Sequence, residues 1–245
     1  MRVHGNEWLS RTPIAHRGLH DDKYPENSMP AFLAAADAGY GVELDLHISS
    51  DDRLVVFHDD DLKRLTGRDG LVTSLDAAQL SELHLNETEY TIPLFEGVLQ
   101  AIDGRVPILA EVKSGSPMAR VGPILDKLVN DYEGPLAIQS FDPRVLIWLK
   151  QNAPHVTRGQ ISGSFKGERL PRAQKLLLQS MLLNAFTRPD FLAFDVRAMP
   201  SAPVFIWRKT LKAPLLLWTV RSTEELTRAH DHDANVIFES IDPAV

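Results

Sequence analysis

Residues 41–46 read Gly-Val-Glu-Leu-Asp-Leu, and this stretch decides the fold class. A short apolar run that follows glycine is typical of a buried β-strand. Glu43 and Asp45 stand two residues apart, so they point to one side of the strand while the apolar residues point to the other. This pattern predicts a barrel strand whose apolar side faces helices and whose acids face the barrel axis.

Outward from this strand, short apolar runs alternate with longer helical patterns along the whole chain. Such alternation indicates βα units around a parallel sheet. We therefore expect an α/β fold, namely a single (β/α)8 TIM barrel that forms one catalytic domain over residues 1–245. Residues 47–105 predict a short excursion after strand two, with an extra strand at 54–57 and small helices around 75–83 and 94–102. The eight expected barrel strands are 13–15, 42–46, 106–112, 136–138, 157–161, 191–196, 215–220 and 235–238. The helices expected between them are 28–38, 117–131, 143–152, 168–186, 202–212 and 223–231, with helix-start signals at Ser28 and Ser222.

The bulk composition excludes several classes of function. The chain has no cysteine, which rules out disulfides, thiolate metal sites and a cysteine nucleophile. Its net charge of −7 argues against bulk attraction to nucleic acid or to an anionic membrane. No apolar run resembles a signal peptide or a membrane span, so we expect a cytoplasmic protein without stable membrane insertion.

Polar residues follow the predicted strands at their carboxyl ends, where the active sites of such barrels lie. Glu43, Asp45 and Glu111 would aim three carboxylates at one point, where they repel one another unless a cation sits among them. Oxygen ligands alone favour a hard divalent ion, Mg²⁺ or Ca²⁺, with Mn²⁺ also compatible. The alternative is that these acids form salt bridges with Lys113 or Arg17.

Two histidines also stand at predicted strand ends. His16 follows the first strand, and His58 follows the extra run at 54–57. Because histidine titrates near neutral pH, one of the pair can accept a proton while the other donates one. His47 follows the acids of strand two, and we expect it to pack outward on the opposite face.

These residues together resemble the glycerophosphodiester phosphodiesterase family. The family opens with His-Arg-Gly and Pro-Glu-Asn-Thr, and it continues with Glu-x-Asp, His-Asp and Glu-x-Lys. The resemblance covers nearly the whole chain, and the matching residues are His16-Arg17-Gly18, Pro25-Glu26-Asn27-Ser28, Glu43 and Asp45, His58-Asp59, Leu62 to Gly70 including Arg64, Ile92 to Glu96, Glu111 and Lys113, Gln139 to Asp142, and Trp218-Thr219-Val220. Two departures follow Trp-Thr-Val, namely Arg221 in place of Asn, and Glu239 in the usually small-residue ending.

The resemblance implies metal-dependent hydrolysis of a small-molecule glycerophosphodiester to an alcohol and sn-glycerol 3-phosphate. It implies that Glu43, Asp45 and Glu111 hold the metal, and that His16 and His58 act as general base and general acid. It further implies phosphate binding by Arg17 and Lys113, and orientation of Arg17 or of the metal ligands by Glu26 and Asn27. Trp218 would contact the glycerol carbons. The attacking group stays open between water and a hydroxyl of the substrate.

Three competing interpretations remain. A phospholipase D-like barrel, or another phosphodiesterase acting on lysophospholipids or sugar phosphodiesters, would show exposed apolar loops for membrane contact. Phe205-Ile206-Trp207 fits that weakly, because residues 202–212 instead predict a packed helix. A barrel that only binds phosphodiesters would be expected to lack one of the two histidines. The three acids could also serve another metal-assisted reaction, because a fold does not fix its function.

Overall fold

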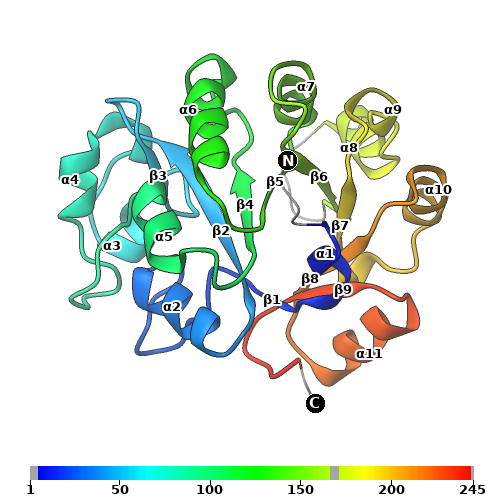
Figure 1. The fold of residues 1–245 in the computed structure, drawn as a ribbon, viewed down its shortest axis with the longest axis horizontal. Helices are drawn as coiled ribbons and strands as arrows, with labels where there is room; N and C mark the ends of the chain where they lie inside the picture. The colour runs from blue at the N-terminus through cyan, green and yellow to red at the C-terminus, as the bar shows by residue number, and fades with distance from the viewer. Residues whose placement is uncertain (1–4, 166–170, 244–245) are drawn as a thin grey trace. The chain divides into compact units, whose positions relative to one another are not determined.

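The computed structural model describes residues 5–165 and 171–243. Its fold is the predicted (β/α)8 barrel, with eight parallel strands among the described residues (Figure 1). The chain divides into two compact units, described in turn below: residues 14–136 form one, and residues 5–13 with 137–243 form the other. None of the described helices is long and apolar enough to cross a bilayer.

The first unit is built around β2 (Gly41–Ile48), which is buried along its whole length. The short β1 (Ile14–Ala15) and β4 (Ile108–Val112) pair with β2 in parallel, one on each side. Helix α2 lies beside α5 (Figure 1). The helices α2, α5 and α6 span Met29–Asp37, Phe95–Ile102 and Met118–Asp131.

The predicted excursion follows β2. Strand β3 (Leu54–Val56) turns back antiparallel to β2, as the extra apolar run indicated. The excursion has a small core of its own around Phe57 and Leu62, both fully buried. The predicted helices are found as α4 (Ala77–Ser81) and α5, whereas α3 (Lys63–Thr66) and the 3-10 turn η1 (Val72–Ser74) were not predicted.

The second unit carries five parallel strands in chain order, β5 to β9. They span Leu136–Ser140, Thr157–Ser162, Phe191–Asp195, Leu215–Val220 and Asn235–Phe238, each within two residues of its predicted bounds. The helices α1, α7, α8, α9, α10 and α11 span Trp8–Arg11, Pro143–Asn152, Arg172–Gln179, Asn184–Thr187, Ala202–Leu211 and Thr223–Asp231, and η2 spans Val196–Ala198.

One predicted helix of the second unit was wrong in extent. Residues 168–186 were expected to form a single helix, but α8 ends at Gln179 and α9 begins only at Asn184. Met181, between them, is buried and adopts a left-handed backbone with φ of 53°, which no α-helix continues through. Residues 168–170 of that prediction lie outside the described part of the chain.

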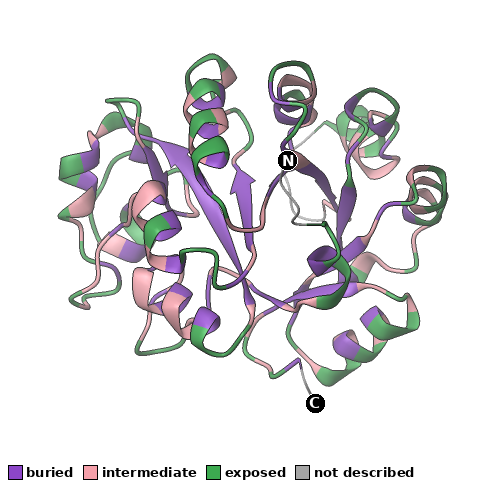
Figure 2. Cartoon of the chain, viewed as in Figure 1, coloured by how far each residue is buried: buried purple, intermediate pink, exposed green. Residues whose placement is uncertain are grey.

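Burial follows the predicted pattern within each unit (Figure 2). The strands are buried and the helices alternate between buried and exposed residues, because each helix covers the sheet with one face only. Side chains at the helix starts accept backbone hydrogen bonds as expected: Ser28 Oγ accepts from Ala31 N, and Ser222 Oγ from Glu225 N. These bonds satisfy one backbone donor at the start of α2 and one at the start of α11.

Candidate active site

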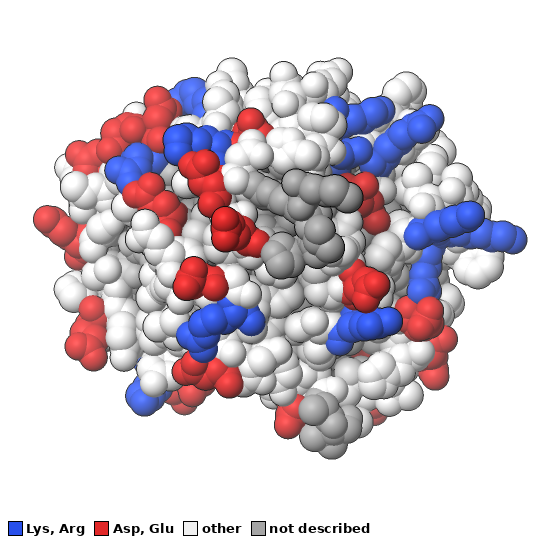
Figure 3. Space-filling model, viewed as in Figure 1, with Lys and Arg blue, Asp and Glu red and all other residues white. Residues whose placement is uncertain are grey.

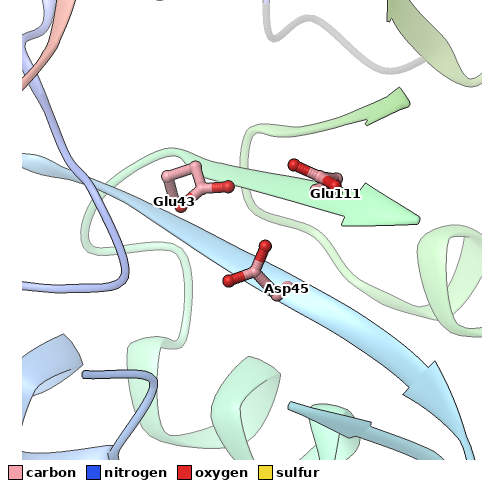
Figure 4. A group of neighbouring side chains, drawn as sticks. All are labelled: Glu43, Asp45 and Glu111. Atoms are coloured by element: carbon pink, nitrogen blue, oxygen red, sulfur yellow. The ribbon is translucent and has the colours of Figure 1, made fainter. Parts of the chain in front are cut away.

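Three carboxylates from neighbouring strands meet in the first unit (Figure 4). Glu43 and Asp45 lie on β2, and the register places Asp45 opposite Glu111 of β4. One oxygen of each residue lies within 4.8 Å of those of the other two, and all three residues are buried. The structure therefore brings together the acids that the spacing along β2 and β4 predicted, in a geometry that suits a metal ion.

The charges around these acids do not balance. Burial, and then the carboxylates of Asp45 and Glu111, raise the pKa of Glu43 well above its usual value. Burial also raises the pKa of Glu111, although Lys113 opposes it. Burial alone would raise the pKa of Asp45, but Lys113 and Arg17 outweigh it and hold that pKa well below its usual range. Three acids face two cations, so the cluster has capacity for a further positive charge.

The two cations are the predicted phosphate-binding residues. Lys113 Nζ lies 2.5 Å from Asp45 Oδ1 and 3.0 Å from Glu111 Oε1. Arg17 Nε lies 3.3 Å from Asp45 Oδ2, and the backbone N–H of Arg17 donates to Glu43 Oε2 at 3.1 Å. The salt bridges that were the alternative to a metal site are thus present, and they place two cations among three carboxylates.

A tight turn sets the position of Arg17 directly after β1. Arg17 and Gly18 have φ of 57° and 82°, so the chain reverses within two residues. A Cβ on Gly18 would lie 2.7 Å from the backbone carbon of Ala31, so only glycine fits there. The His-Arg-Gly motif is therefore explained by close packing of the turn against α2.

Asn27 holds Asp45 through two hydrogen bonds. Its Nδ2 donates to Asp45 Oδ2 at 2.8 Å, and its Oδ1 accepts from the backbone N–H of Asp45 at 3.2 Å. Asn27 is fully buried, and its φ of 56° is a conformation that asparagine tolerates better than most residues. These contacts match the orienting role that the resemblance implied.

His58 belongs to a chain of charged contacts that sequence reasoning did not foresee. Its Nδ1 donates to Asp59 Oδ1 at 2.7 Å, and Arg64 Nε donates to Asp59 Oδ2 at 2.6 Å. Arg64 also contacts both oxygens of Glu26 at 2.8 Å, and Glu26 in turn accepts from Arg17 Nη1 at 2.7 Å. Arg64 thus links His58, through Asp59 and Glu26, to Arg17. In the sequence, only the place of Arg64 within the family-like Leu62–Gly70 run indicated that it belongs to the site.

Protonation of His58 is disfavoured by its surroundings. Burial, and then the charge of Lys113, lower the pKa of His58 below its ordinary value. Because Nδ1 donates to Asp59, the neutral ring leaves Nε2 free of a proton and able to accept one. The imidazole is thereby fixed in one tautomer.

His16 follows β1 as predicted and is partly exposed. Since Ala15 pairs with Val42, the parallel register brings His16 level with Glu43 at the same strand ends. Trp218 lies on β8 in the second unit, where its ring packs edge-to-face on Phe141 at 5.5 Å. It lines a cavity of about 780 Å³ together with Phe165 and Asp195.

The prediction for His47 was wrong. Residue 47 is two positions beyond Asp45, so its side chain leaves β2 on the same side as that acid. His47 is buried, and its Nε2 donates to the backbone carbonyl of His58 at 3.3 Å. It therefore contacts the loop that carries the second histidine.

The two departures from the family pattern contact each other. Arg221 donates through Nε and Nη2 to the two carboxylate oxygens of Glu239, at 3.2 and 2.9 Å. The two departures therefore form one salt bridge in the second unit, between a guanidinium and a carboxylate. This fork geometry is the strongest pairing that a guanidinium and a carboxylate can make.

Comparison with known proteins identifies the family. The profile of the glycerophosphoryl diester phosphodiesterase family matches residues 16–239. The chain belongs to this family. It is a family of phosphodiester hydrolases, and its match includes every residue of the predicted site from His16 to Trp218.

Individual members of the family show the same likeness. A glycerophosphodiester phosphodiesterase of Bacillus altitudinis is 31% identical over 155 residues, which are 58% of this chain and 63% of that protein. A second, from Caldanaerobacter subterraneus subsp. tengcongensis, is 32% identical over 158 residues, covering 60% of this chain and 64% of its own length. The matched region thus spans less than two thirds of these curated relatives.

Solved structures of the family share the fold over almost the entire chain. A phosphodiesterase of Oleispira antarctica, determined with its product sn-glycerol-3-phosphate, superimposes with a TM-score of 0.77 at 22% identity, covering 93% of this chain and 92% of that one. A glycerophosphodiester phosphodiesterase of Thermotoga maritima gives 0.71 at 23% identity, covering 94% of each chain. Their resemblance to this family member lies in the fold.

Proposed function

We propose that this protein is a single catalytic domain that hydrolyses glycerophosphodiesters to sn-glycerol 3-phosphate and an alcohol, with the help of a divalent metal ion. The observation that carries the proposal is the buried cluster of Glu43, Asp45 and Glu111, flanked by Lys113 and Arg17. Family membership and the likeness to an enzyme solved with sn-glycerol-3-phosphate support the substrate class.

The three acids fit a hard divalent cation, Mg²⁺ or Ca²⁺, with Mn²⁺ as a further choice. They offer oxygen ligands only, and burial together with mutual repulsion raises the pKa of Glu43, which a bound cation would reverse. When bound there, such an ion supplies Lewis-acid polarisation of a phosphoryl oxygen. Asn27 would keep Asp45 oriented toward it through its two hydrogen bonds.

Arg17 and Lys113 are the groups that would bind the phosphate. The guanidinium offers a planar fork and the ammonium a point charge, and both are already held at the carboxylate cluster. A phosphodiester carries one negative charge before reaction and accumulates more during it. Fixed cations at this position therefore favour the transition state over the bound substrate.

The histidines would move the protons. His16 takes the proton of the attacking hydroxyl, which belongs to water or to the glycerol moiety. His58 must first take up a proton from solvent on Nε2, and it then delivers that proton to the departing alkoxide. An alkoxide is a poor leaving group, so a positioned acid contributes about 10²–10⁴ in rate. The bond from His58 Nδ1 to Asp59 directs Nε2 to this exchange.

A lysophospholipid is the second candidate substrate. The cavity of about 780 Å³ in the second unit is lined by the aromatic rings of Phe141, Phe165 and Trp218, which suit an apolar group better than a small polar alcohol. In this proposal Trp218 contacts the substrate carbons. A human relative named lysophospholipase D is 36% identical over 107 residues, which are 42% of this chain.

The proposal is tested by following products with ³¹P NMR, using glycerophosphocholine, glycerophosphoethanolamine and lysophosphatidylcholine as substrates. We expect sn-glycerol 3-phosphate from the first two, and its loss in the variants His16→Ala and His58→Ala. Choline phosphate with free glycerol would show that the other ester bond is cleaved. Turnover of the lysophospholipid alone would favour the second candidate.

A further inference from the structure

Exposed apolar side chains gather in one part of the second unit. Among the described residues outside that part of the second unit, Leu71 in the first unit is the one large apolar side chain that is comparably exposed. Scattered exposed leucines are ordinary, whereas a concentration of them marks a surface that contacts something. The gathered residues are Leu176, Leu177, Leu182, Phe186, Phe205 and Ile206, on or between α8, α9 and α10, and we call them the apolar patch.

The helices that carry the patch lack ordinary packing. Helix α8 contains no buried residue at all, and its Leu176 is 67% exposed. In α10, Phe205 and Ile206 are 71% and 59% exposed, although a packed helix was predicted there. Trp207 Nε1 donates to the carbonyl of Ser180, just after α8, at 3.3 Å. This bond joins α8 and α10 into one surface.

The same segment is basic in an acidic chain. Residues 171–212 contain seven Lys and Arg and two Asp residues, which is a formal charge of +5, whereas the whole chain has −7. The rest of the chain therefore carries −12. Figure 3 shows basic side chains gathered on the side of the molecule where Figure 1 places α8, α9 and α10. The net charge of the chain thus conceals a local positive surface.

In α10 the apolar and basic side chains share one face. Phe205 and Lys209 are four residues apart, so they lie along the same side of the helix, and Lys212 follows directly after its last residue. All three are exposed, and together with Arg208 they line a hollow of about 660 Å³. An exposed ring next to ammonium groups is the arrangement of interfacial segments, in which the ring enters the acyl region and lysines stay with the phosphates.

We propose that the apolar patch, together with Lys209 and Lys212, docks this protein on the surface of an anionic phospholipid bilayer. Charge complementarity selects this occupant over a second copy of the chain, because a symmetric dimer would place the basic side chains of this segment against one another. Separate apolar side chains on three short helices suit lipid, which needs no matching shape. The contact is peripheral, and it does not depend on the proposed reaction.

Vesicle sedimentation of the whole protein tests the proposal. Vesicles of phosphatidylcholine with phosphatidylglycerol are compared with vesicles of phosphatidylcholine alone, at low and high salt. One variant, Phe205→Ser with Ile206→Ser, removes apolar contact, and another, Lys209→Gln with Lys212→Gln, removes charge. Leu71→Ser and Lys127→Gln in the first unit are the matched controls, since both residues are also exposed.

We expect binding to the anionic vesicles that weakens with salt and is unchanged in the controls. Removing the two lysines should weaken it about 25-fold, at about fivefold for each basic residue near the surface. Removing Phe205 and Ile206 should weaken it at least about tenfold. The proposal is overturned if the wild type does not bind the anionic vesicles, or if both patch variants bind them as tightly as the wild type does. Self-association that Phe205→Ser with Ile206→Ser abolishes also overturns it, because a second copy would then occupy the patch.

Discussion

Asn27 provides a quantitative test of how the metal-binding acids are held. In the variant Asn27→Gly, the buried backbone N–H of Asp45 loses its acceptor, which costs about 1–3 kcal/mol. The carboxylate of Asp45 also loses a donor at 2.8 Å, and a hydrogen bond to a charged group contributes about 1.5–3 kcal/mol. Urea denaturation in EDTA should therefore show a free energy of unfolding lower by about 2.5–6 kcal/mol.

The backbone supplies an internal comparison. Glycine adopts the φ of 56° at position 27 freely, so Asn27→Ala should cost about 1–2 kcal/mol more than Asn27→Gly. Asn86 is the matched control, because it is exposed and has a φ of 48°. Asn86→Gly should be nearly neutral. An Asn27→Gly variant as stable as the wild type would refute the claim that Asn27 holds Asp45.

Three further outcomes are expected. Arg64→Ala releases Asp59 and Glu26, so kcat for glycerophosphocholine should fall about 10–100-fold. The loss should be smaller for a p-nitrophenyl diester, because its leaving group needs no proton from His58. Equal losses of kcat on the two substrates would contradict the claim that Arg64 acts through His58. The folded state binds a proton at Glu43 more tightly than the unfolded chain, whose pKa is near 4.5. In EDTA, Glu43 should therefore lower the free energy of unfolding by up to about 1.4 kcal/mol per pH unit between that value and its raised folded-state pKa. Glu43→Gln should make the measured slope shallower in urea titrations, and the part that remains comes from the raised pKa of Glu111. Arg221→Glu should lower the melting temperature slightly, since a partly exposed ion pair contributes about 0–1 kcal/mol. Adding Glu239→Arg in the same chain should restore the melting temperature. A double variant that melts as low as Arg221→Glu alone would mean that the two residues act separately.

The parts of the structure that follow from local pattern were predictable. Buried parallel strands must be short apolar runs, so all eight were found, and side-chain alternation placed Glu43 and Asp45 on one side of β2. The same alternation places His47 on that side as well, and the expectation that it packs outward misapplied it. Helices α3 and η1 are too short to leave a periodic pattern in the sequence.

What escaped prediction depends on contacts between distant residues. The link from His58 through Asp59 and Arg64 to Glu26 joins positions up to 38 residues apart, and no spacing rule relates them. The exposure of Phe205 was also hidden, because a helix that packs on the barrel and a helix that presents apolar residues to solvent have similar sequences. Sequence pattern indicates which face of an element is apolar, and tertiary structure decides what covers it.

The most direct test of the central claim is the metal dependence of glycerol 3-phosphate release from glycerophosphocholine. Wild type, Glu43→Ala and the control Glu133→Ala, which removes an exposed acid outside the cluster, are assayed with Mg²⁺, Ca²⁺ or EDTA. We predict release with at least one ion by the wild type and the control, none in EDTA, and none by Glu43→Ala. Release that persists in EDTA, or in Glu43→Ala, would contradict the assignment of the three buried carboxylates to a catalytic metal.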